Sequence, residues 1–383
     1  MVMPNWITRK QKILPIGLDI GHSSIKMVQL GVTDEGLNVV AAERVAVPVG
    51  DDTSDAARRD QVVRAIKQML TEGEFKGRNV VSALPAGRLR ITSLRLGETD
   101  QQQADRVLRK EAAHRFALDP ATDVIHHIRA GRVQQGDEVK DEFILFATDN
   151  ETIKAHIALL EECGLTPTGI DAGPCALFRN FDRMMRRQED RECTIIFIDI
   201  GHQYTTVVFG RGGEICFVKQ MKFGVARFAQ DIAATLDIGV ADAEALRLKI
   251  QNGDSVDAAT GRLVMDTLGA TAEALAGELS LCLRYYSVTF RGKRVARAIV
   301  AGGGAHETVL VDAIKHRLGI KTEPAEPLRG LDLTNLRGEK GPHDLTTDFA
   351  QAIGLSLKEW RCPTLAAESL ESGPEPVLEG GRS

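Results

Sequence analysis

The sequence is poor in aromatic residues and has no excess of positive charge. Aromatic side chains make up 5% of the 383 residues, too few for a surface on which the bases of a single-stranded nucleic acid stack. The formal net charge is −5, so bulk charge gives no attraction to nucleic acid or to an anionic membrane. We therefore expect no nucleic-acid partner.

Redox, zinc-binding and membrane-spanning patterns are also missing. The cysteines form no C-x-x-C pair and the nine histidines form no H-E-x-x-H spacing, which favours reduced thiols and disfavours a zinc site. No apolar run approaches the roughly 18 residues of a membrane helix, and the start of the chain lacks the apolar part of a secretory signal. These features predict a cytoplasmic chain without direct membrane insertion, which reaches a membrane only through a partner. The six cysteines are Cys163, Cys175, Cys193, Cys216, Cys282 and Cys362.

An internal repeat is the strongest positive pattern. The segment LDIGHSSIKMVQL begins at Leu18, and IDIGHQYTTVVFG begins at Ile198. In both, an apolar residue and Asp-Ile-Gly-His precede an alternating strand, and the aligned Asp19 and Asp199 lie 199 − 19 = 180 residues apart. A period this long does not indicate a solenoid. It predicts two lobes that are built on the same subdomain and face each other.

The chemistry of these turns suits a polyphosphate. A glycine at the turn lets backbone N–H groups approach an oxyanion, as Gly21 and Gly201 would do. The aspartate two residues earlier can orient waters around Mg²⁺, and Ser23, Ser24 and Lys26 can donate to phosphate oxygens. For one copy alone a plain β-turn is the better interpretation. Two copies predict that turns from both lobes bind the polyphosphate.

A third element follows late in the chain. The segment AIVAGGGAHETVL starts at Ala298 and combines an apolar strand, the glycines 302–304 and a helix start, where free N–H groups could meet a ring or a phosphate. Its late position does not fit a Rossmann G-x-G-x-x-G, which belongs after the first strand of a βαβ unit, and the chain has no P-loop pattern.

Composition and periodicity divide the chain into segments. We expect an N-terminal extension at 1–12, a first lobe at 13–90 and 165–192, and an inserted α+β segment at 91–164 of βαββα type that ends with a helix near 151–163. The stretch 182–192 predicts a charged linker. The second lobe covers 193–362, with a helical subdomain at about 225–290, and a last helix is expected near 345–360. The tail 363–383 is rich in Pro, Gly and Glu, which predicts disorder.

In this order, the three elements resemble the phosphate-1, phosphate-2 and adenosine motifs of the actin, sugar kinase and Hsp70 superfamily. Within it the chain looks most like the PilM family of type IV pilus assembly, over roughly residues 14–360, and more distantly like FtsA. The resemblance implies an α/β actin-like ATPase fold with ribonuclease H-like duplicated lobes and a small inserted α+β subdomain, as in FtsA and PilM. It rests on GLDIGHSSIKMVQL, RKEAAHRFAL, EECGLTPTGIDAGPCALFR, FIDIGHQYTTVVF, FGVARFAQDIAATLDIGVADAEALRLK and VAGGGA.

The resemblance also implies ATP and Mg²⁺ as ligands and assigns residues to them. Asp19 and Asp199 would hold Mg²⁺ through water, and Asp171 falls where relatives place a group near the attacking water. Asp171 could equally be a turn or cap residue, Lys26 a solvated strand residue, and Glu244 with Arg247 an exposed helix pair. The implied nucleotide-binding residues are Asp19, Gly21, Ser23, Ser24, Lys26, Asp199, Gly201, Glu244, Arg247, Gly302, Gly303 and Gly304.

Three departures from the family pattern concern catalysis. His22 stands where Ser or Thr is usual, and His202 stands where Hsp70-like chains have Gly, followed by Gln203 and Tyr204. Arg247 replaces a lysine, which keeps the charge but changes the hydrogen-bond geometry. We therefore expect weak or no ATPase activity.

For a partner, the resemblance implies the N-terminal peptide of a PilN-like inner-membrane pilus assembly protein. We expect it in a groove between the insertion and the first lobe, at Leu84, Leu89, Ile91 and Leu94, although each of these could instead be core. Two other functions stay open: an FtsA-like division filament protein, which the acidic tail disfavours, and a sugar-kinase-type phosphotransferase, for which no substrate motif is evident. The sequence leaves open whether the chain forms homo-oligomers.

Overall fold

A computed structural model describes residues 12–48, 54–97, 101–185, 188–290, 294–334 and 347–360. The predicted extension at 1–12, except for Lys12, and the predicted tail at 363–383 lie outside these residues. Within them, no helix is long and apolar enough to cross a membrane.

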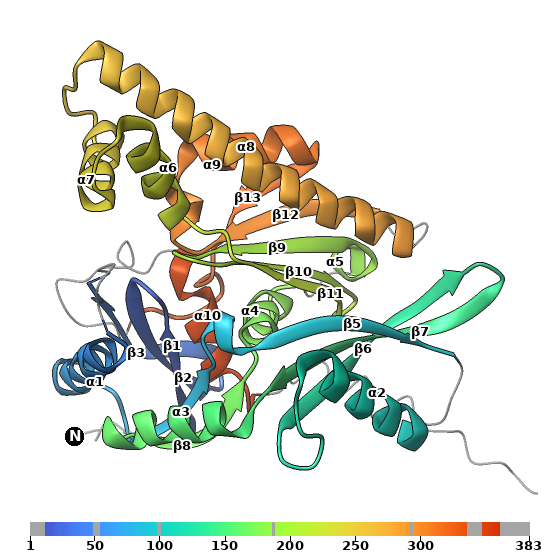
Figure 1. Cartoon of the computed structure of the whole chain (residues 1–383). Helices are drawn as coiled ribbons and strands as arrows, with labels where there is room; N and C mark the ends of the chain where they lie inside the picture. Colours follow the sequence, from blue (N-terminus) through green and yellow to red (C-terminus); the bar gives the residue numbers. More distant parts are fainter. Residues whose placement is uncertain are drawn as a thin grey trace, which may run out of the picture.

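Two five-stranded sheets repeat one topology (Figure 1). The first is ordered β3-β2-β1-β4-β8, and the second is ordered β11-β10-β9-β12-β13. In each, three antiparallel strands are followed by two strands that pair in parallel. The predicted duplication is therefore confirmed. The strands are β1 (Lys12–Ile20), β2 (Ser24–Thr33), β3 (Gly36–Ala46), β4 (Asn79–Ala83), β8 (Thr166–Asp171), β9 (Thr194–Ile200), β10 (Thr205–Arg211), β11 (Glu214–Met221), β12 (Val295–Ala301) and β13 (Lys321–Pro324).

Helices cover both faces of the first sheet. On one face lie α1 (Asp55–Glu72) and α3 (Asn150–Glu162), because Ile66 of α1 and Leu160 of α3 share a buried cluster with Ile16 and Leu18 of β1. On the other face lies α10 (Ala350–Ser356), which is shorter than the helix expected at 345–360. The helix α3 was expected in the insertion, but its apolar stripe is buried against the first sheet.

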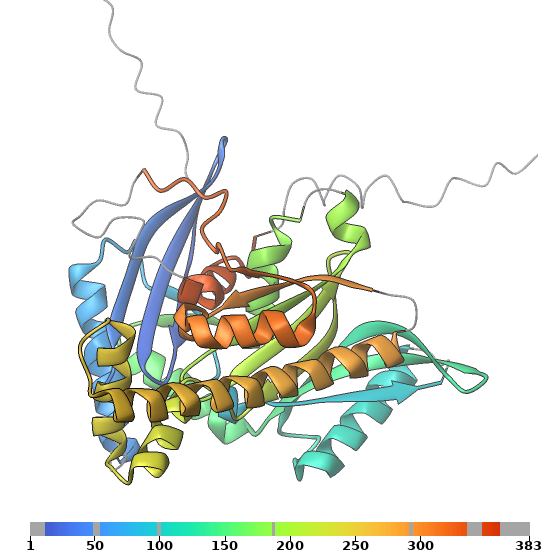
Figure 2. The same ribbon diagram turned by 90° about the horizontal axis from the view of Figure 1, so that it is seen from above.

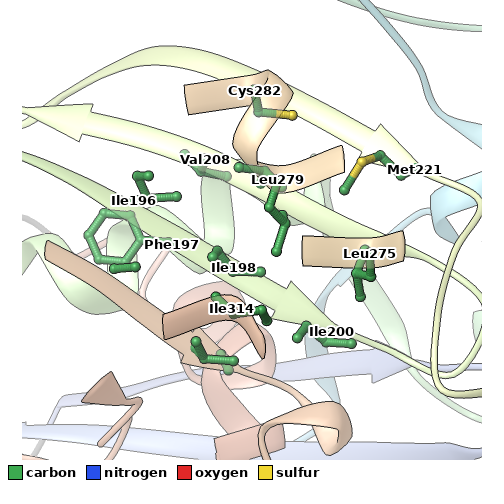
Figure 3. Packing of buried hydrophobic residues seen from close by; sticks show 14 of the residues in the cluster. Ile196, Phe197, Ile198, Ile200, Val208, Met221, Leu275, Leu279, Cys282 and Ile314 are labelled. Carbon is green, nitrogen blue, oxygen red and sulfur yellow. The ribbon is translucent and has the colours of Figure 1, made fainter. Parts of the chain in front are cut away.

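Four helices belong to the second lobe. They are α6 (Ala226–Leu236), α7 (Val240–Gln251), α8 (Ala258–Thr289) and α9 (Thr308–Leu318). With 32 residues, α8 is much longer than the other three. Leu275 and Leu279 of α8 are buried with Ile196 and Ile198 of β9 (Figure 3). The helices α8 and α9 run side by side on this face (Figure 2). Strand alternation turns Phe197 to the other face, where it stacks on Phe181.

Two helices lie between the sheets (Figure 1). One is α10, and the other is α4 (Gly173–Asp182), which carries Phe181. The stretch 182–192, predicted to be a linker, contains α5 (Gln188–Glu192). Arg183, in the same stretch, is buried, and its guanidinium donates to the carbonyl oxygens of Pro327 and Arg329.

The insertion has its own three-stranded sheet in the order β5-β7-β6. Its elements are β5 (Arg90–Leu96), α2 (Gln101–Phe116), β6 (Val124–Gln135) and β7 (Glu138–Thr148). Strands β6 and β7 form one long hairpin, with Gln135 paired to Glu138 next to the turn. One face of the sheet packs on α2 through Leu108 and Leu145. The other face joins the core of the second lobe, where Ile144 and Phe217 belong to one cluster.

Close packing of α10 gives a stability prediction. A Cβ on Gly354 would overlap the carbonyl oxygen of Ala176 in α4, whereas a Cβ on Gly269 in α8 would meet nothing within 4 Å. Gly354→Ala should therefore lower the free energy of unfolding by about 3 kcal/mol through overpacking. Gly269→Ala should raise it by up to about 1 kcal/mol, since alanine is the better helix former. Urea unfolding of both variants checks this, and an unchanged midpoint for Gly354→Ala would contradict the packing.

Candidate nucleotide cleft and apolar groove

The repeated turns have the same backbone geometry. Gly21 N–H donates to the carbonyl oxygen of Ser24 at 3.1 Å, and Gly201 N–H donates to that of Tyr204 at 2.9 Å. Each turn is also fastened by the first helix that follows its meander. Arg58 of α1 donates to the carbonyl oxygens of Gly21 and His22. In the second lobe, N–H groups at the start of α6 donate to the carbonyls of Gly201 and His202.

Carboxylates from both lobes meet beside these turns. Asp19 at the end of β1 forms a 3.3 Å ion pair with Lys26 Nζ and accepts a 2.7 Å hydrogen bond from Gln351 Nε2. Asp199, at the matching end of β9, is near enough to Asp19 and Lys26 to interact electrostatically with both. The Lys26 side chain is buried, so it is not a solvated strand residue.

The charge balance of this cluster is negative. Burial, followed by repulsion from Asp19, raises the pKa of Asp199 to about 6, although Lys26 opposes the shift. Burial alone would lower the pKa of Lys26, but the carboxylates of Asp19, Asp348 and Asp199 raise it above its ordinary value. A cation would relieve the repulsion between the carboxylates.

Hydrated Mg²⁺ fits this chemistry better than a dehydrated metal. The described residues include no group of three or more His, Cys, Asp and Glu side chains that could enclose a metal by themselves. Mg²⁺ keeps several waters and is commonly held by one or two carboxylates together with substrate phosphates. Asp19 and Asp199 are carboxylates of this kind, so the donor set is compatible with the predicted ion.

The glycine turn after β12 lies against Asp199. Gly302 has φ of 80°, and a Cβ there would overlap the Asp199 carboxylate and the carbonyl oxygen of Ile200. Gly304 is equally restricted by the Ile200 side chain, whereas a Cβ on Gly303 would meet nothing within 4 Å. Gly302 and Gly304 are therefore required for close packing of the turn on β9. Gly303 leaves open space next to the cleft.

Arg247 is the centre of a charged cluster and not an exposed helix residue. It is 6% exposed and makes two hydrogen bonds to the carboxylate of Glu244, at 2.8 and 2.7 Å. A further ion pair joins it to Glu307, the N-cap residue of α9. Burial would lower the pKa of Arg247, but the two glutamates raise it. One arginine between two carboxylates leaves acceptor capacity that could serve ribose hydroxyls.

Asp171 lies at a second site. Its carboxylate forms ion pairs with Arg179 at 3.0 Å and Lys358 at 3.1 Å. It also lines a cavity of about 730 Å³ between the insertion and the first sheet. No hydrogen bond or ion pair found among the described residues joins Asp171 to the cleft, so the geometry lends no support to its predicted catalytic role.

The cavity is an apolar groove with two strand edges. One wall comes from β6 and β7 of the insertion, and the other from α3 and β8. The strands β6 and β8 are both the last strands of their sheets, so their outer edges are open to pairing. The residues that line the groove are Leu84, Leu89, Val124, His126, Ile128, Phe146, Ala147, Thr148, Ile153, Ile157, Glu161, Thr166, Pro167, Thr168, Gly169, Ile170, Asp171, Ala172, Cys175 and Lys358.

Two of the four predicted partner-binding residues line this groove. Leu84 and Leu89 do so, whereas Ile91 packs on the core of the second lobe and Leu94 packs under α2. Ile91 and Leu94 lie three positions apart on β5, so their side chains point to opposite faces of its sheet. For Ile91 and Leu94 the structure therefore favours the alternative interpretation, that they are core.

Several contributors to the two sites were not anticipated. Arg58, Asp348 and Gln351 come from segments with no motif, and only the tertiary fold brings them to the cleft. Glu307 lies in the glycine segment that starts at Ala298, but it was not singled out there. Ile153 and Ile157 left a weaker signal. They are apolar positions four residues apart on α3 that lie outside its buried stripe of His156 and Leu160.

Solved structures of other proteins align with most of this chain. A solved structure titled as the PilM–PilN type IV pilus biogenesis complex aligns with a TM-score of 0.73 and 21% identity, covering 91% of this chain and 99% of the other. The ethanolamine utilization protein EutJ of Carboxydothermus hydrogenoformans aligns with a TM-score of 0.49 and 15% identity, over 93% of this chain and 90% of EutJ. MreB5 of Spiroplasma citri, bound to ADP, aligns at 0.43 and 12%, over 94% and 99%.

The family comparison covers most of the chain. The family model described as "Type IV pilus assembly protein PilM" matches residues 17–360. Both copies of the repeat, the insertion and the glycine turn lie inside that match. The chain therefore has the actin-like ATPase fold and belongs to the PilM family of type IV pilus assembly proteins.

Proposed function

We propose that this chain is a nucleotide-binding adaptor of the type IV pilus machinery. It binds MgATP between its lobes and holds the N-terminal peptide of a PilN-like inner-membrane protein in the apolar groove. The observation that carries the nucleotide part is the pair of equivalent turns that bring Asp19 and Asp199 together. A partner that spans the membrane would place the chain at the inner membrane from the cytoplasmic side.

Different residues of the cleft contact different parts of the nucleotide. N–H groups of the turns at Gly21 and Gly201, with Ser23 and Lys26, face the polyphosphate. Asp19 and Asp199 hold waters around Mg²⁺, which supplies charge neutralisation for the phosphates. The open face at Gly303 gives room for the base. Glu244 accepts hydrogen bonds from ribose hydroxyls while Arg247 fixes its orientation.

The groove suits an extended apolar peptide. Its walls are mostly apolar, and the free edges of β8 and β6 can pair with the main chain of an added strand. Lys358 and Asp171 form an ion pair at the wall, which offers charged partners to polar groups of the peptide. A sugar-kinase function gains no comparable support, because the carboxylate of Asp171 is already held by two cations.

Blocking the space at Gly303 should prevent nucleotide binding. A Cβ on Gly303 would meet no atom of the described residues within 4 Å, so for Gly303→Val we expect an unchanged melting temperature and at least a tenfold loss of ATP affinity. Asp19→Asn should weaken binding only when Mg²⁺ is present. Fluorescence titration with ATP, with and without Mg²⁺, measures both. The control is Gly261→Ala in α8, and ATP binding as tight as wild type in both cleft variants would refute the cleft assignment.

Hydrolysis should be slow. A hydrolytic site needs donors placed in advance for the charge of the transition state. In the second turn, however, the bulky His202, Gln203 and Tyr204 stand in place of small donors, and Tyr204 lies against Gly87 of the first lobe. We expect multiple turnover well below the roughly 1–100 s⁻¹ of ordinary phosphoryl transfer. A phosphate-release assay checks this, and a rate inside that range would contradict it.

A charge in the groove should abolish peptide docking. Ile157→Asp puts an unpaired carboxylate on the groove wall without touching a core cluster, and burial of such a charge is costly. We expect at least a tenfold loss of affinity for a synthetic peptide of a PilN-like N-terminus, measured by fluorescence anisotropy. Val107→Asp on α2, where Val107 is 41% exposed, is the matched control. Equal loss in both variants, or in neither, would place the peptide elsewhere.

A further inference from the structure

Two histidines connect the lobes across the candidate nucleotide cleft. His22 and His202 directly follow Gly21 and Gly201, so they occupy equivalent places in the two repeated turns. Their rings are stacked, with centroids 5.0 Å apart and planes inclined by 5°. One ring comes from the first lobe and the other from the second. A polyphosphate gripped by both turns must therefore enter beside this stack or separate it.

The surroundings of the two rings favour their neutral forms. Burial, then Arg58 and then His202 lower the pKa of His22 to about 4. For His202, burial lowers the pKa, Glu244 raises it, and Arg247 and Arg58 lower it, with a net shift downward. Nδ1 of His22 is buried and has no hydrogen-bond partner among the described residues. Neutral rings can stack closely, whereas two imidazolium ions would repel each other and Arg58.

A polyphosphate reverses this charge balance. Its negative oxygens, placed between the turns, would face His22 and His202 together with the cation of Arg58. An opposite charge within about 4–6 Å favours the protonated imidazole, and a charged N–H donor to phosphate makes a stronger hydrogen bond than a neutral one. The orphaned Nδ1 of His22 would then gain a partner.

We propose that His22 and His202 are proton-linked phosphate ligands, whose stacked rings take up protons from solvent when a polyphosphate binds. The proposal rests on the nucleotide site proposed above. No covalent bond changes: solvent protons bind to the imidazoles, and the imidazolium N–H groups donate to phosphate oxygens. The pair takes the place that hydroxyl or glycine residues hold in related phosphate loops, and it makes occupation of the cleft sensitive to pH.

The direction of the pH dependence follows from linkage. Binding takes up a proton wherever the complex binds more protons than the free protein. For His22 this window begins near pH 4, where the free ring titrates, and extends up to the pKa of the ring in the complex. Above that pKa the ring is neutral in both states. Within the window, ATP affinity should fall about tenfold per pH unit for each proton taken up.

Calorimetry tests the proposal directly. MgATP is titrated into the full chain at pH 6 in PIPES and in Bis-Tris, and the difference in observed enthalpy gives the number of protons bound per nucleotide. We expect net uptake for wild type. The double variant His22→Asn, His202→Asn should lose most of the proton uptake. The uptake that remains in it comes from protonation of the nucleotide and of other groups. His114→Asn, at an exposed position on α2, should keep it.

Two further measurements distinguish a failure of this inference from a failure of the nucleotide site. Tripolyphosphate with Mg²⁺ should cause the same uptake as ATP, whereas adenosine should cause none, because the phosphates carry the effect. Histidine ring NMR shifts should show one or both imidazoles becoming charged on binding. Tight ATP binding with equal proton uptake in wild type and double variant would overturn this inference alone. The absence of ATP binding at any pH would overturn the nucleotide site and the inference together.

Discussion

The cleft depends on one electrostatic constraint: carboxylates from two lobes are held close together beside a buried lysine. Burial and mutual repulsion raise the pKa of Asp199 to about 6, while Lys26 and the hydrogen bond from Gln351 offset the charge at Asp19. The repulsion in this cluster is relieved when a carboxylate takes up a proton, when a cation binds, or when the distance between the lobes changes. The lobe arrangement and the ligand charge are therefore linked, because a bound ligand has to compensate the excess negative charge of these carboxylates.

The cleft and the groove share one short segment. Gln351 in α10 holds Asp19 in the cleft, and Lys358, just after the same helix, holds Asp171 in the groove. A Cβ on Gly173, at the start of α4, would overlap the Gln351 side-chain amide, so α4 and α10 fix each other. The helices between the sheets thus hold one aspartate in each site, Asp19 in the cleft and Asp171 in the groove.

The sequence was most informative where a backbone requirement repeats. The Asp-Ile-Gly-His turns predicted the duplicated sheets and the approach of Asp19 to Asp199, because two apolar strands that both end in Asp and Gly require the same turn twice. The sequence was least informative about contacts between residues that lie hundreds of positions apart in the chain. Nothing in the local pattern of α3 distinguishes burial under the first sheet from burial in the insertion, since an amphipathic helix packs equally well on either. Gln351, Arg58 and Glu307 are ordinary polar residues until the fold brings them to the cleft.

The face of the first sheet that α10 covers is completed by residues that the ribosome makes late. Ser356 Oγ donates to the carbonyl oxygen of Pro15 and accepts from Leu30 N–H, across 341 and 326 residues of chain. Leu14 and Val28 are buried in one cluster with Phe349 and Ile353. A nascent chain therefore carries an uncovered apolar sheet face throughout the synthesis of the insertion and the second lobe, and contacts of such long range form slowly. Biogenesis of this protein should depend on factors that shield that face until the α10 segment has left the ribosome.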